Sequence, residues 1–324
     1  MRAVVIRGAG GPEVLSVEEV AVPVRREDEV VIDVVAAGLN RADVQQRRGL
    51  YPPPEGASTV PGLEVSGYVA DPGRSRFAEG DAVVALLAGG GYAEKVVVPA
   101  GQVVRAPDGV GLEEAAALPE TAATVWSNLV THAGLSEGDD VLIHGASGGI
   151  GVMAIQVSLA LGAVPHVTAG YDAKLDVARS LGVRTLINYR EQDFVEELRA
   201  ATDGRGADVI LDVVGAKYLA RNVASLATGG RLVVIGLQGG VRAELDLGAL
   251  MARRASVAGT TLRARPVAEK AAIMSAVEDN VWPLVASGAV RPFVDRTFPL
   301  DQVAEAHSYF DAGKHTGKIL LSMR

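Results

Sequence analysis

The stretch from Val141 to Tyr171 constrains the fold of this chain more than any other segment, because it contains no Asp, Glu, Lys or Arg. It opens with the apolar run Val141–His144, continues with the glycine-rich loop Gly145–Gly151 and ends in a long apolar segment. Strand, glycine turn and helix in that order bring backbone N–H groups and a helix N-terminus to one point, where they bind phosphate. The sequence therefore predicts a dinucleotide-binding unit and, with it, a redox enzyme.

The same stretch raises the question of a membrane span, since about 20 apolar residues cross a bilayer. Glycines cluster at its front, and Gly162 and Pro165 interrupt it. The helical part, from Gly149 to Leu161, is too short to cross. A helix buried against a parallel sheet has the same apolar character, because the layers on both of its sides are apolar. We therefore expect no membrane contact.

Composition restricts the function further. A net charge of −8 argues against a nucleic-acid surface, because phosphate binding needs a basic face. The chain has no cysteine, which excludes disulfides and thiolate metal sites, and its five histidines lack the spacing of metal ligands. His144 and His166 fall inside strand patterns and are expected in the core. The N-terminus carries no apolar signal segment, so we expect a cytoplasmic protein.

Two kinds of pattern divide the chain, whose length of 324 residues itself predicts two domains. Residues 1–118 carry short Val-rich runs between glycine and proline turns, which is typical of a small barrel or sandwich. From 139 to 260, strand and helix patterns alternate as in a doubly wound parallel sheet. The sequence thus predicts an α/β protein in which a nucleotide domain, 121–261, is inserted into a β-rich domain formed by 1–120 and 262–324.

Six strands are expected in the parallel sheet, with helices between them. These strands are Asp140–His144, Val164–Thr168, Thr185–Ile187, Asp208–Asp212, Arg231–Ile235 and Ser256–Gly259. A helix is also expected over 112–133 and another over 266–287, and the chain is expected to end in a strand at Lys318–Ser322.

Each glycine of the loop has a separate predicted role. Gly145 permits the tight turn, Gly148 and Gly149 let the backbone approach a pyrophosphate, and Gly151 allows close packing of helix on sheet. A lone glycine fingerprint is a weak signal. Here a strand precedes it, a helix follows it and further strand–helix units come after, which favours the dinucleotide over glycines that only pack.

The end of the next strand bears on cofactor choice. NAD-specific folds place an acid there to hold the ribose 2′-OH, whereas this chain has Gly170. Lys174 begins the following helix, and Tyr189 with Arg190 closes the third strand. A cation and a phenol at these strand ends favour a 2′-phosphate, and we therefore predict NADPH. Lys174 and Arg190 also fit the alternative of solvated surface residues.

Motifs along essentially the whole chain resemble those of the medium-chain dehydrogenase/reductase superfamily, and most closely those of its zinc-free quinone oxidoreductase branch. These motifs are Leu39–Asp43, Arg47–Pro54, Pro61–Gly67, Ala117–Pro119, Gly145–Gly151, Asn188–Tyr189 and Thr316–Ile319. The resemblance implies a Rossmann nucleotide domain, a GroES-like catalytic domain and a homodimer. The dimer would form through the edge strand near Ser256–Gly259, because covering an unpaired edge removes a liability.

The resemblance also implies the cofactor contacts. Lys174 and Tyr189 match the family's pair around the 2′-phosphate. A serine that commonly contacts this phosphate is here Tyr171, which puts that part of the site in doubt. The implied cofactor-binding residues are Thr124, Ser147, Gly148, Gly149, Ile150, Gly170, Lys174, Tyr189, Val214, Leu237 and Gln238.

Zinc-dependent relatives use a cysteine in the segment 37–40 and a Gly-His-Glu, which here reads Gly62-Leu63-Glu64. Glu64 alone does not hold zinc, so we expect no metal. Without a Lewis acid, the expected reaction is hydride transfer from NADPH to an electron-poor acceptor, a quinone or an enone.

Asn40 and Tyr51 match residues beside the nicotinamide and are the candidate donors to the acceptor oxygen. Asn40 also fits a cap for a helix over 41–48, and Tyr51 an aromatic packed on the prolines that follow it. Two loops, Pro52–Ser58 and Gly89–Gly91, are expected to flank the substrate entrance.

Two other functions compete with quinone reduction. One is an NADPH-dependent enoyl or alkenal reductase, which shares the predicted fold and lacks zinc. The other is a stress protein that binds NADPH without catalysis.

Overall fold

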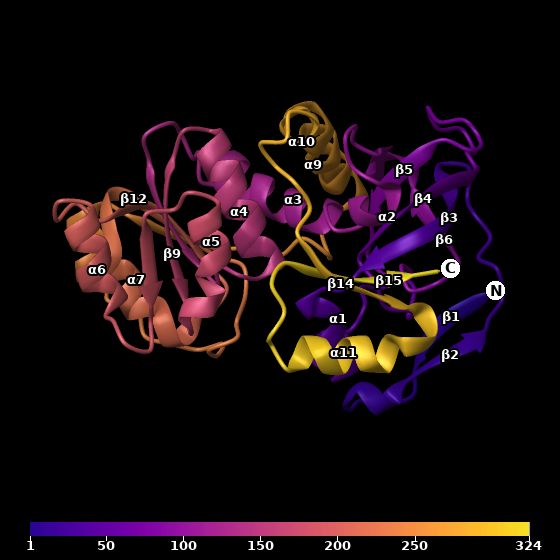
Figure 1. The fold of residues 1–324 in the computed structure, drawn as a ribbon, viewed down its shortest axis with the longest axis horizontal. Coiled ribbons are helices and arrows are strands. Elements are labelled where there is room, and N and C mark those ends of the chain that lie inside the picture. The colour runs from indigo at the N-terminus through magenta and orange to yellow at the C-terminus, as the bar shows by residue number, and fades with distance from the viewer. Residues whose placement is uncertain (324) are drawn as a thin grey trace. The chain divides into compact units, whose positions relative to one another are not determined.

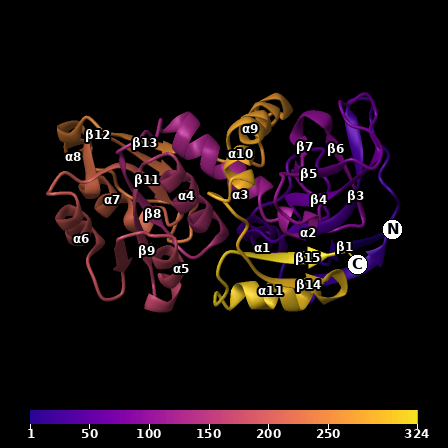
Figure 2. The same cartoon turned by 45° about the horizontal axis from the view of Figure 1, so that its top comes forward.

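The computed structural model describes residues 1–323, and its chain divides into two compact units. The first unit comprises Met1–Ala123 together with the C-terminal part from Leu262, and the second comprises Thr124–Thr261. Figures 1 and 2 show the chain leaving the first unit for the second and returning to it. Each unit is described by itself below.

The second unit is built on a six-stranded parallel sheet in the order β10-β9-β8-β11-β12-β13. The order turns at β8 and β11, so the chain winds outward in both directions from the centre, and the predicted doubly wound sheet is confirmed. Its strands are β8 (Asp140–His144), β9 (Val164–Ala169), β10 (Thr185–Asn188), β11 (Ala207–Asp212), β12 (Leu226–Val234) and β13 (Ser256–Gly259).

Helices cover both faces of this sheet. Helix α4 contacts α5, whereas α6 contacts α7 and α7 contacts α8, which forms two separate helical layers. These helices are α4 (Gly149–Ala160), α5 (Asp176–Ser180), α6 (Phe194–Ala201), α7 (Leu219–Ser225) and α8 (Leu247–Arg253). Helix α5 is short, and a 3-10 turn, η4 (Asp172–Lys174), forms first and leads into it.

The first unit is a mixed sheet in the order β14-β15-β3-β4-β5-β7, and β6 pairs with β3 beside it. Strands β1 and β2 form a separate hairpin. The strands are β1 (Arg2–Ile6), β2 (Leu15–Glu19), β3 (Glu29–Gly38), β4 (Glu64–Asp71), β5 (Ala82–Leu86), β6 (Lys95–Pro99), β7 (Val103–Arg105), β14 (Val294–Pro299) and β15 (Lys318–Ser322). Strand β15 pairs with β3, so the last residues of the chain complete a sheet begun near its start.

Helices and 3-10 turns pack against this sheet and its hairpin. Helix α9 packs on η2 and β7, and α11 contacts β2, β14 and β15. These elements are η1 (Pro12–Val14), α1 (Arg41–Arg47), η2 (Ala100–Gln102), α2 (Leu112–Ala115), α3 (Pro119–Val125), α9 (Val267–Asn280), α10 (Trp282–Ala286), η6 (Leu300–Gln302) and α11 (Val303–Asp311). The core beneath them is rich in valine, as the alternating strand patterns require.

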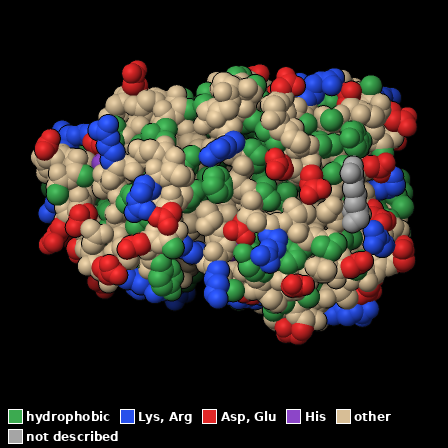
Figure 3. Space-filling view, viewed as in Figure 1, with side chains coloured by type: hydrophobic (Ala, Val, Ile, Leu, Met, Phe, Trp, Pro, Cys, Tyr) green, Lys and Arg blue, Asp and Glu red, His purple; other side chains and the backbone are tan. Residues whose placement is uncertain are grey.

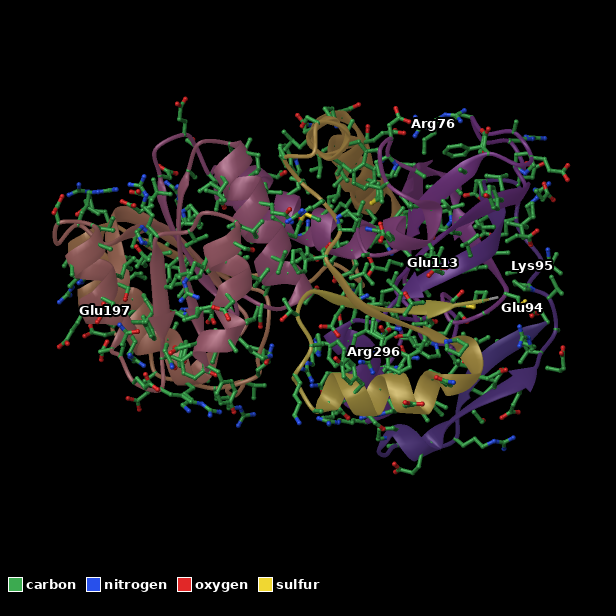
Figure 4. All side chains as sticks on the ribbon, viewed as in Figure 1. Arg76, Glu94, Lys95, Glu113, Glu197 and Arg296 are labelled. Carbon is green, nitrogen blue, oxygen red and sulfur yellow. The ribbon has the colours of Figure 1, made fainter. Side chains whose placement is uncertain are left out.

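Charged side chains lie mostly at the surface. Glu94 and Lys95 stand at the start of β6, where Glu94 pairs with Arg2 and Lys95 with Asp33. On the face drawn in Figure 3, basic and acidic side chains alternate over both units instead of forming one basic surface. Within residues 1–323, no helix combines the length and the apolar character that a membrane span requires.

Candidate functional site

The glycine loop between β8 and α4 has the tight turn that its sequence predicts. Gly145 has φ +85°, a conformation that glycine adopts without a penalty. The backbone N–H groups of Gly145 and Ala146 donate to the carbonyl of Thr168 on β9, at 3.1 and 3.0 Å, which fixes the turn to the sheet. A Cβ atom on Gly151 would lie 2.1 Å from the carbonyl oxygen of Gly145. The first turn of α4 therefore packs on the loop in a way that only glycine permits.

Gly148 differs from these two glycines. Its φ is −77°, and it stands at the N-cap of α4. A Cβ atom there would meet no protein atom closer than 3.8 Å. The protein's own packing does not require glycine at this position, so the N-terminus of α4 keeps open space beside it. Ser147, Gly149 and Ile150 lie on the same loop and helix start.

The ends of β9 and β10 lie side by side next to this loop, since the two strands pair in parallel with Asn188 opposite Ala169. Gly170 follows β9, and Tyr189 follows β10 with 40% of its side chain exposed. A Cβ atom on Gly170 would lie 2.7 Å from the Tyr189 hydroxyl oxygen. The phenol thus occupies the space in which an acidic side chain would otherwise stand. Lys174 lies at the end of η4, one short turn from Gly170.

A third group forms where β11 and β12 end. Asp212 is fully buried, and its carboxylate accepts hydrogen bonds from the backbone N–H groups of Val214 at 2.6 Å and Gly215 at 3.0 Å. Burial raises the pKa of Asp212 above its ordinary value, and these two donors oppose that shift. The N–H of Gln238 donates to the carbonyl of Val213 at 3.3 Å. The structure thus brings Val214 and the exposed pair Leu237 and Gln238 into adjoining loops.

Thr124 lies near the end of α3, directly before a π-helix, η3 (Trp126–His132). Its carbonyl accepts a hydrogen bond from the Asn128 side chain at 2.7 Å. Asn128 in turn accepts one from the hydroxyl of Thr260, which follows β13. Single π-helical turns occur often at functional sites, because they move side chains out of the regular helical register. This turn had no signal in the sequence pattern.

Aromatic rings pack together beneath the carboxyl edge of this sheet. His144, at the end of β8, contacts Thr168 at 2.9 Å and Asn222 at 2.8 Å, and packs edge-on against the Tyr218 ring. Burial lowers the pKa of His144 to about 4, so the imidazole is neutral at pH 7. Tyr218 also packs edge-on against Tyr189, with ring centres 6.2 Å apart. The expectation that His144 and His166 are core residues is confirmed by their burial.

In the first unit, Asn40 belongs to a buried polar group with Glu64 and Lys318. The Asn40 side-chain amide donates to Glu64 at 2.9 Å, and its oxygen accepts from the Lys318 ammonium at 2.6 Å. Lys318 also pairs with Glu64 at 2.6 Å and donates to the Leu39 carbonyl at 2.7 Å. Glu64 is fully buried and Lys318 is 5% exposed. The carboxamide of Asn40 is therefore committed to partners within the protein.

Asn40 also stands at the N-cap of α1, as one of the two interpretations of its role predicts. Asp43 reaches back to accept from the Asn40 backbone N–H at 2.8 Å, and it accepts further from the Gly62 N–H and the Tyr92 hydroxyl. Asp43 is fully buried, and burial raises its pKa to about 6 against the opposing effect of these three donors. The start of α1 is thus held rigidly.

Tyr51 is half-buried beside Arg263 in the first unit. The Arg263 guanidinium carbon lies 5.4 Å from the centre of the Tyr51 ring, and this side chain donates to the Tyr51 carbonyl at 3.3 Å. Arg263 also donates to the Ala88 carbonyl at 2.8 Å and to the Gln46 side chain at 2.6 Å. Burial raises the pKa of the Tyr51 phenol and Arg263 lowers it, with burial the larger effect. The phenol therefore keeps its proton at neutral pH.

The two loops expected at an entrance lie against each other. A Cβ atom on Gly89 would lie 2.5 Å from the Ser58 carbonyl oxygen, and the N–H of Gly90 donates to the Val60 carbonyl at 2.7 Å. These contacts, together with the hydrogen bond from the Arg263 side chain to the Ala88 carbonyl, hold the two loops against each other.

The donor set in the first unit does not fit zinc. Ala37 and Leu63 supply no ligand atom, and Glu64 is already paired with Lys318. Among residues 1–323, no three or more His, Cys, Asp or Glu side chains are grouped so as to hold a metal ion.

Sequence reasoning gave no functional role to four of the residues that the structure places in these groups, namely Asp43, Asp212, Arg263 and Lys318. Asp43 was detectable, because an acid three residues after Asn40 is a capping pattern. Lys318 and Glu64 meet only through the pairing of β15 with β3 and of β3 with β4, and no local pattern announces that contact.

Known proteins resemble the chain over its whole length. The family model for the alcohol dehydrogenase GroES-like domain matches residues 26–108, and that for a zinc-binding dehydrogenase matches residues 181–321. The quinone oxidoreductase of Homo sapiens is 30% identical over 326 residues, which cover 99% of this chain and 97% of that protein.

Solved structures share the fold. The structure of an NAD-dependent alcohol dehydrogenase is 34% identical with a TM-score of 0.88, and covers 100% of both chains. Escherichia coli quinone oxidoreductase complexed with NADPH is 30% identical with a TM-score of 0.87, and covers 99% of this chain and 100% of that one. The CurK enoyl reductase is 27% identical with a TM-score of 0.86, and covers 100% of this chain and 99% of that one. On its fold and these full-length matches, the chain belongs to the medium-chain dehydrogenase/reductase superfamily and is a relative of its quinone oxidoreductases.

Proposed function

We propose that this oxidoreductase reduces quinones with NADPH and without a metal. The observation that carries the proposal is the carboxyl edge of the parallel sheet, where Gly148 leaves room at the N-terminus of α4 and Tyr189 fills the space over Gly170. The first feature favours a pyrophosphate, and the second replaces the acid that would hold an unphosphorylated ribose. The quinone oxidoreductases similar to this chain add support.

The residues of the second unit would hold the cofactor in parts. Ser147, Gly148, Gly149 and Ile150 would bind the pyrophosphate through the loop and the first turn of α4. Lys174 and Tyr189, beside Gly170, would bind the 2′-phosphate. Thr124, Val214, Leu237 and Gln238 would contact the nicotinamide end, with Asp212 fixing the loop that carries Val214.

A bound reduced nicotinamide supplies the hydride, so the protein has to position the acceptor and exclude water. We assign the Tyr51 phenol as the hydrogen-bond donor to the acceptor oxygen, because it keeps its proton at neutral pH. Asn40 belongs to the same site, and its role is to shape the acceptor pocket, because its own amide is held by Glu64 and Lys318.

The same polar group supports the proposal of metal-free chemistry. The Lys318 ammonium neutralises Glu64, and Ala37 and Leu63 stand where zinc-dependent relatives carry ligands. With no electrophilic cation to polarise an alcohol, a quinone suits the site, since it delocalises the incoming charge by itself.

Steady-state reduction of 1,2- and 1,4-quinones and of simple enones, with NADPH and NADH side by side and with added chelator, tests the proposal. We expect quinone turnover with NADPH, a kcat/KM for NADPH at least tenfold above that for NADH, and no effect of the chelator. A preference for NADH, or loss of activity on chelation, would contradict it.

The second candidate function is an NADPH-dependent enoyl or alkenal reductase. The similarity to the CurK enoyl reductase, with a TM-score of 0.86, favours it specifically. Product analysis separates the two functions, because an enone gives a saturated ketone whereas a quinone gives a hydroquinone or semiquinone. Tight NADPH binding without turnover of either class would instead indicate the non-catalytic stress protein.

Four further expectations belong to this proposal. The two compact units are proposed to be the GroES-like and Rossmann domains, and the chain is proposed to form a homodimer through β13, which lies at the sheet edge. The loops Pro52–Ser58 and Gly89–Gly91 are proposed to flank the entrance, and the protein to work in the cytoplasm. A monomeric mass in solution would exclude the dimer.

A further inference from the structure

Arg190, at the carboxyl edge of the second unit's sheet, carries a charge that no carboxylate of residues 1–323 neutralises in an ion pair. Its guanidinium carbon lies 4.0 Å from the centre of the Tyr171 ring, which is itself 52% exposed. Its Nε lies 3.4 Å from the place of a Cβ atom on Gly170, and the Tyr189 hydroxyl lies 2.7 Å from that same place. A cation and a phenol therefore meet above one glycine.

The two turns that carry these side chains are tied together by one buried residue, Asn188. Its side-chain oxygen accepts from the Arg190 backbone N–H at 3.2 Å, and its amide donates to the Asp172 carboxylate at 3.0 Å. Asp172 begins η4, the turn that ends in Lys174. The Asn188 contacts thus fix the turn after β9 relative to the turn after β10. The backbone that carries Tyr189 and Arg190 is therefore held in place beside Gly170.

The chemistry of this cluster selects a phosphate monoester. The guanidinium has several N–H donors in one plane, which match two phosphate oxygens at once, and a stacked aromatic ring holds that plane without using any donor. Two carboxylates lie on the same edge: Asp172, which its contact with Asn188 draws into the turn, and the exposed Glu191, which follows Arg190 in the chain.

We propose that Arg190, held by Tyr171, determines the specificity of this site for a ribose 2′-phosphate, acting with Tyr189 and Lys174. The inference rests on the proposed NADPH dependence and names the residue that produces it. Tyr171 thereby takes over the contribution of the serine that similar enzymes carry, by positioning a cation instead of donating a hydroxyl.

Calorimetric titration of NADPH and NADH into the wild type, Arg190→Ala and Arg190→Lys tests this, without any need for turnover. We expect Arg190→Ala to raise the Kd for NADPH about tenfold and to leave that for NADH unchanged, because one charge-assisted contact to the phosphate is lost. Arg190→Lys restores part of the affinity. Arg184→Ala is the matched control, since Arg184 is an exposed arginine at the other end of β10 and is expected to change neither Kd.

The same calorimetric titration tests the role of Tyr171. Tyr171→Ala is expected to weaken NADPH about threefold in the wild-type background, which is the size of an exposed cation–π contact, and to have no effect when Arg190 is already alanine. Adenosine 2′,5′-bisphosphate and 5′-AMP as probes separate the phosphate from the rest of the cofactor, and only the former should respond to Arg190→Ala.

The outcomes distinguish this inference from the proposed function. A wild type that binds NADH as tightly as NADPH contradicts both. A wild type that prefers NADPH and keeps this preference after Arg190→Ala contradicts the role assigned to Arg190 and leaves the NADPH dependence standing. Loss of the preference in Lys174→Ala would then assign the specificity to Lys174.

Discussion

Polar and charged side chains are exposed at the carboxyl edge of the second unit's sheet, whereas those of the buried polar group in the first unit are paired within the protein. At the sheet edge, Arg190 and Tyr189 are exposed and face a glycine. In the first unit, Glu64 and Lys318 are buried and satisfy each other and Asn40. Groups that await a ligand remain open to water, because leaving them buried without partners is costly. Groups that take partners within the protein hold its shape.

The difference is visible among the glycines as well. Gly151 is required by the protein, because a Cβ atom there would lie 2.1 Å from a carbonyl oxygen, whereas at Gly148 the nearest protein atom would be 3.8 Å away. The space at Gly148 is therefore not taken up by the protein's own packing, which the proposed phosphate contact requires. We call the glycine loop and the sheet edge around Gly170 the open region, and the buried group around Asn40, Glu64 and Lys318 the closed region. Substitutions in the open region are expected to change cofactor affinity, and substitutions in the closed region are expected to change the free energy of unfolding.

The largest effect is expected from Lys318→Met. It leaves the fully buried Glu64 carboxylate without its cation, which costs about 3–5 kcal/mol in the free energy of unfolding. Urea unfolding measures it, with the exposed Lys217→Met as control. The double variant Glu64→Gln/Lys318→Met should lose less than Lys318→Met alone, because no charge is left buried. A double variant as unstable as the single one would show that the pair does not act through its charges.

The next effect concerns pH. The pKa of His144 falls from its model-peptide value of 6.5 to about 4 in the folded protein, so the unfolded chain binds a proton that the folded one does not. This contribution to stability is complete above pH 6.5 and is lost as the pH falls toward 4, at a cost of about 3 kcal/mol. His307, with a pKa of about 3, acts in the same direction, and Asp43, with a pKa of about 6, acts in the opposite one.

Urea unfolding of the wild type and of His144→Gln between pH 4 and pH 7 isolates the histidine. The variant should be less stable at pH 7, because two hydrogen bonds are disturbed, and should show a shallower loss of stability in acid. Parallel curves for the two proteins would mean that His144 is not the titrating group.

A smaller effect is expected at the phosphate loop. Gly148→Ala should weaken NADPH binding by at least tenfold and leave the free energy of unfolding nearly unchanged, since its Cβ atom meets no protein atom within 3.8 Å. Gly151→Ala is the contrasting variant and should lower stability, because of its clash with Gly145. Calorimetry and urea unfolding on both proteins check the pair. An NADPH affinity in Gly148→Ala equal to that of the wild type would exclude this loop as the phosphate-binding site.

The smallest effect is expected from Tyr51→Phe, which removes one hydrogen-bond donor near the proposed acceptor. We expect kcat for quinone reduction to fall about three- to tenfold with no change in NADPH affinity, because the acceptor delocalises most of the charge itself. Tyr68→Phe, at an exposed position in the same unit, serves as control. Equal kcat values for Tyr51→Phe and the wild type would exclude the phenol as a donor.

Features of the open region were largely predictable from the sequence. The bounds of β8 and β13 agree with their predicted ranges, and β15 also agrees. The glycine loop is local in sequence, and consecutive parallel strands bring their carboxyl ends to one edge, which places Tyr189 beside Gly170. What the sequence left open was the occupant of the space above Gly170 and the partner of Arg190.

The closed region was far less predictable. The sequence offered two interpretations of Asn40, and the structure shows it both at the N-cap of α1 and in a network with Glu64 and Lys318. The pairing of those two charges depends on strands that lie far apart in the chain. The same holds for Arg263, which joins Gln46, Tyr51 and Ala88 after the chain has returned from the second unit.

The sequence by itself determined the doubly wound sheet, its glycine loop and the glycine in place of an acid at position 170, because strand and helix periodicity and glycine's freedom at positive φ act over neighbouring residues. Only the tertiary structure decided which charges are neutralised inside the protein and which stay exposed to water. That division depends on burial and on contacts between distant strands, and a charge leaves water at an acceptable cost only where the fold supplies its partner.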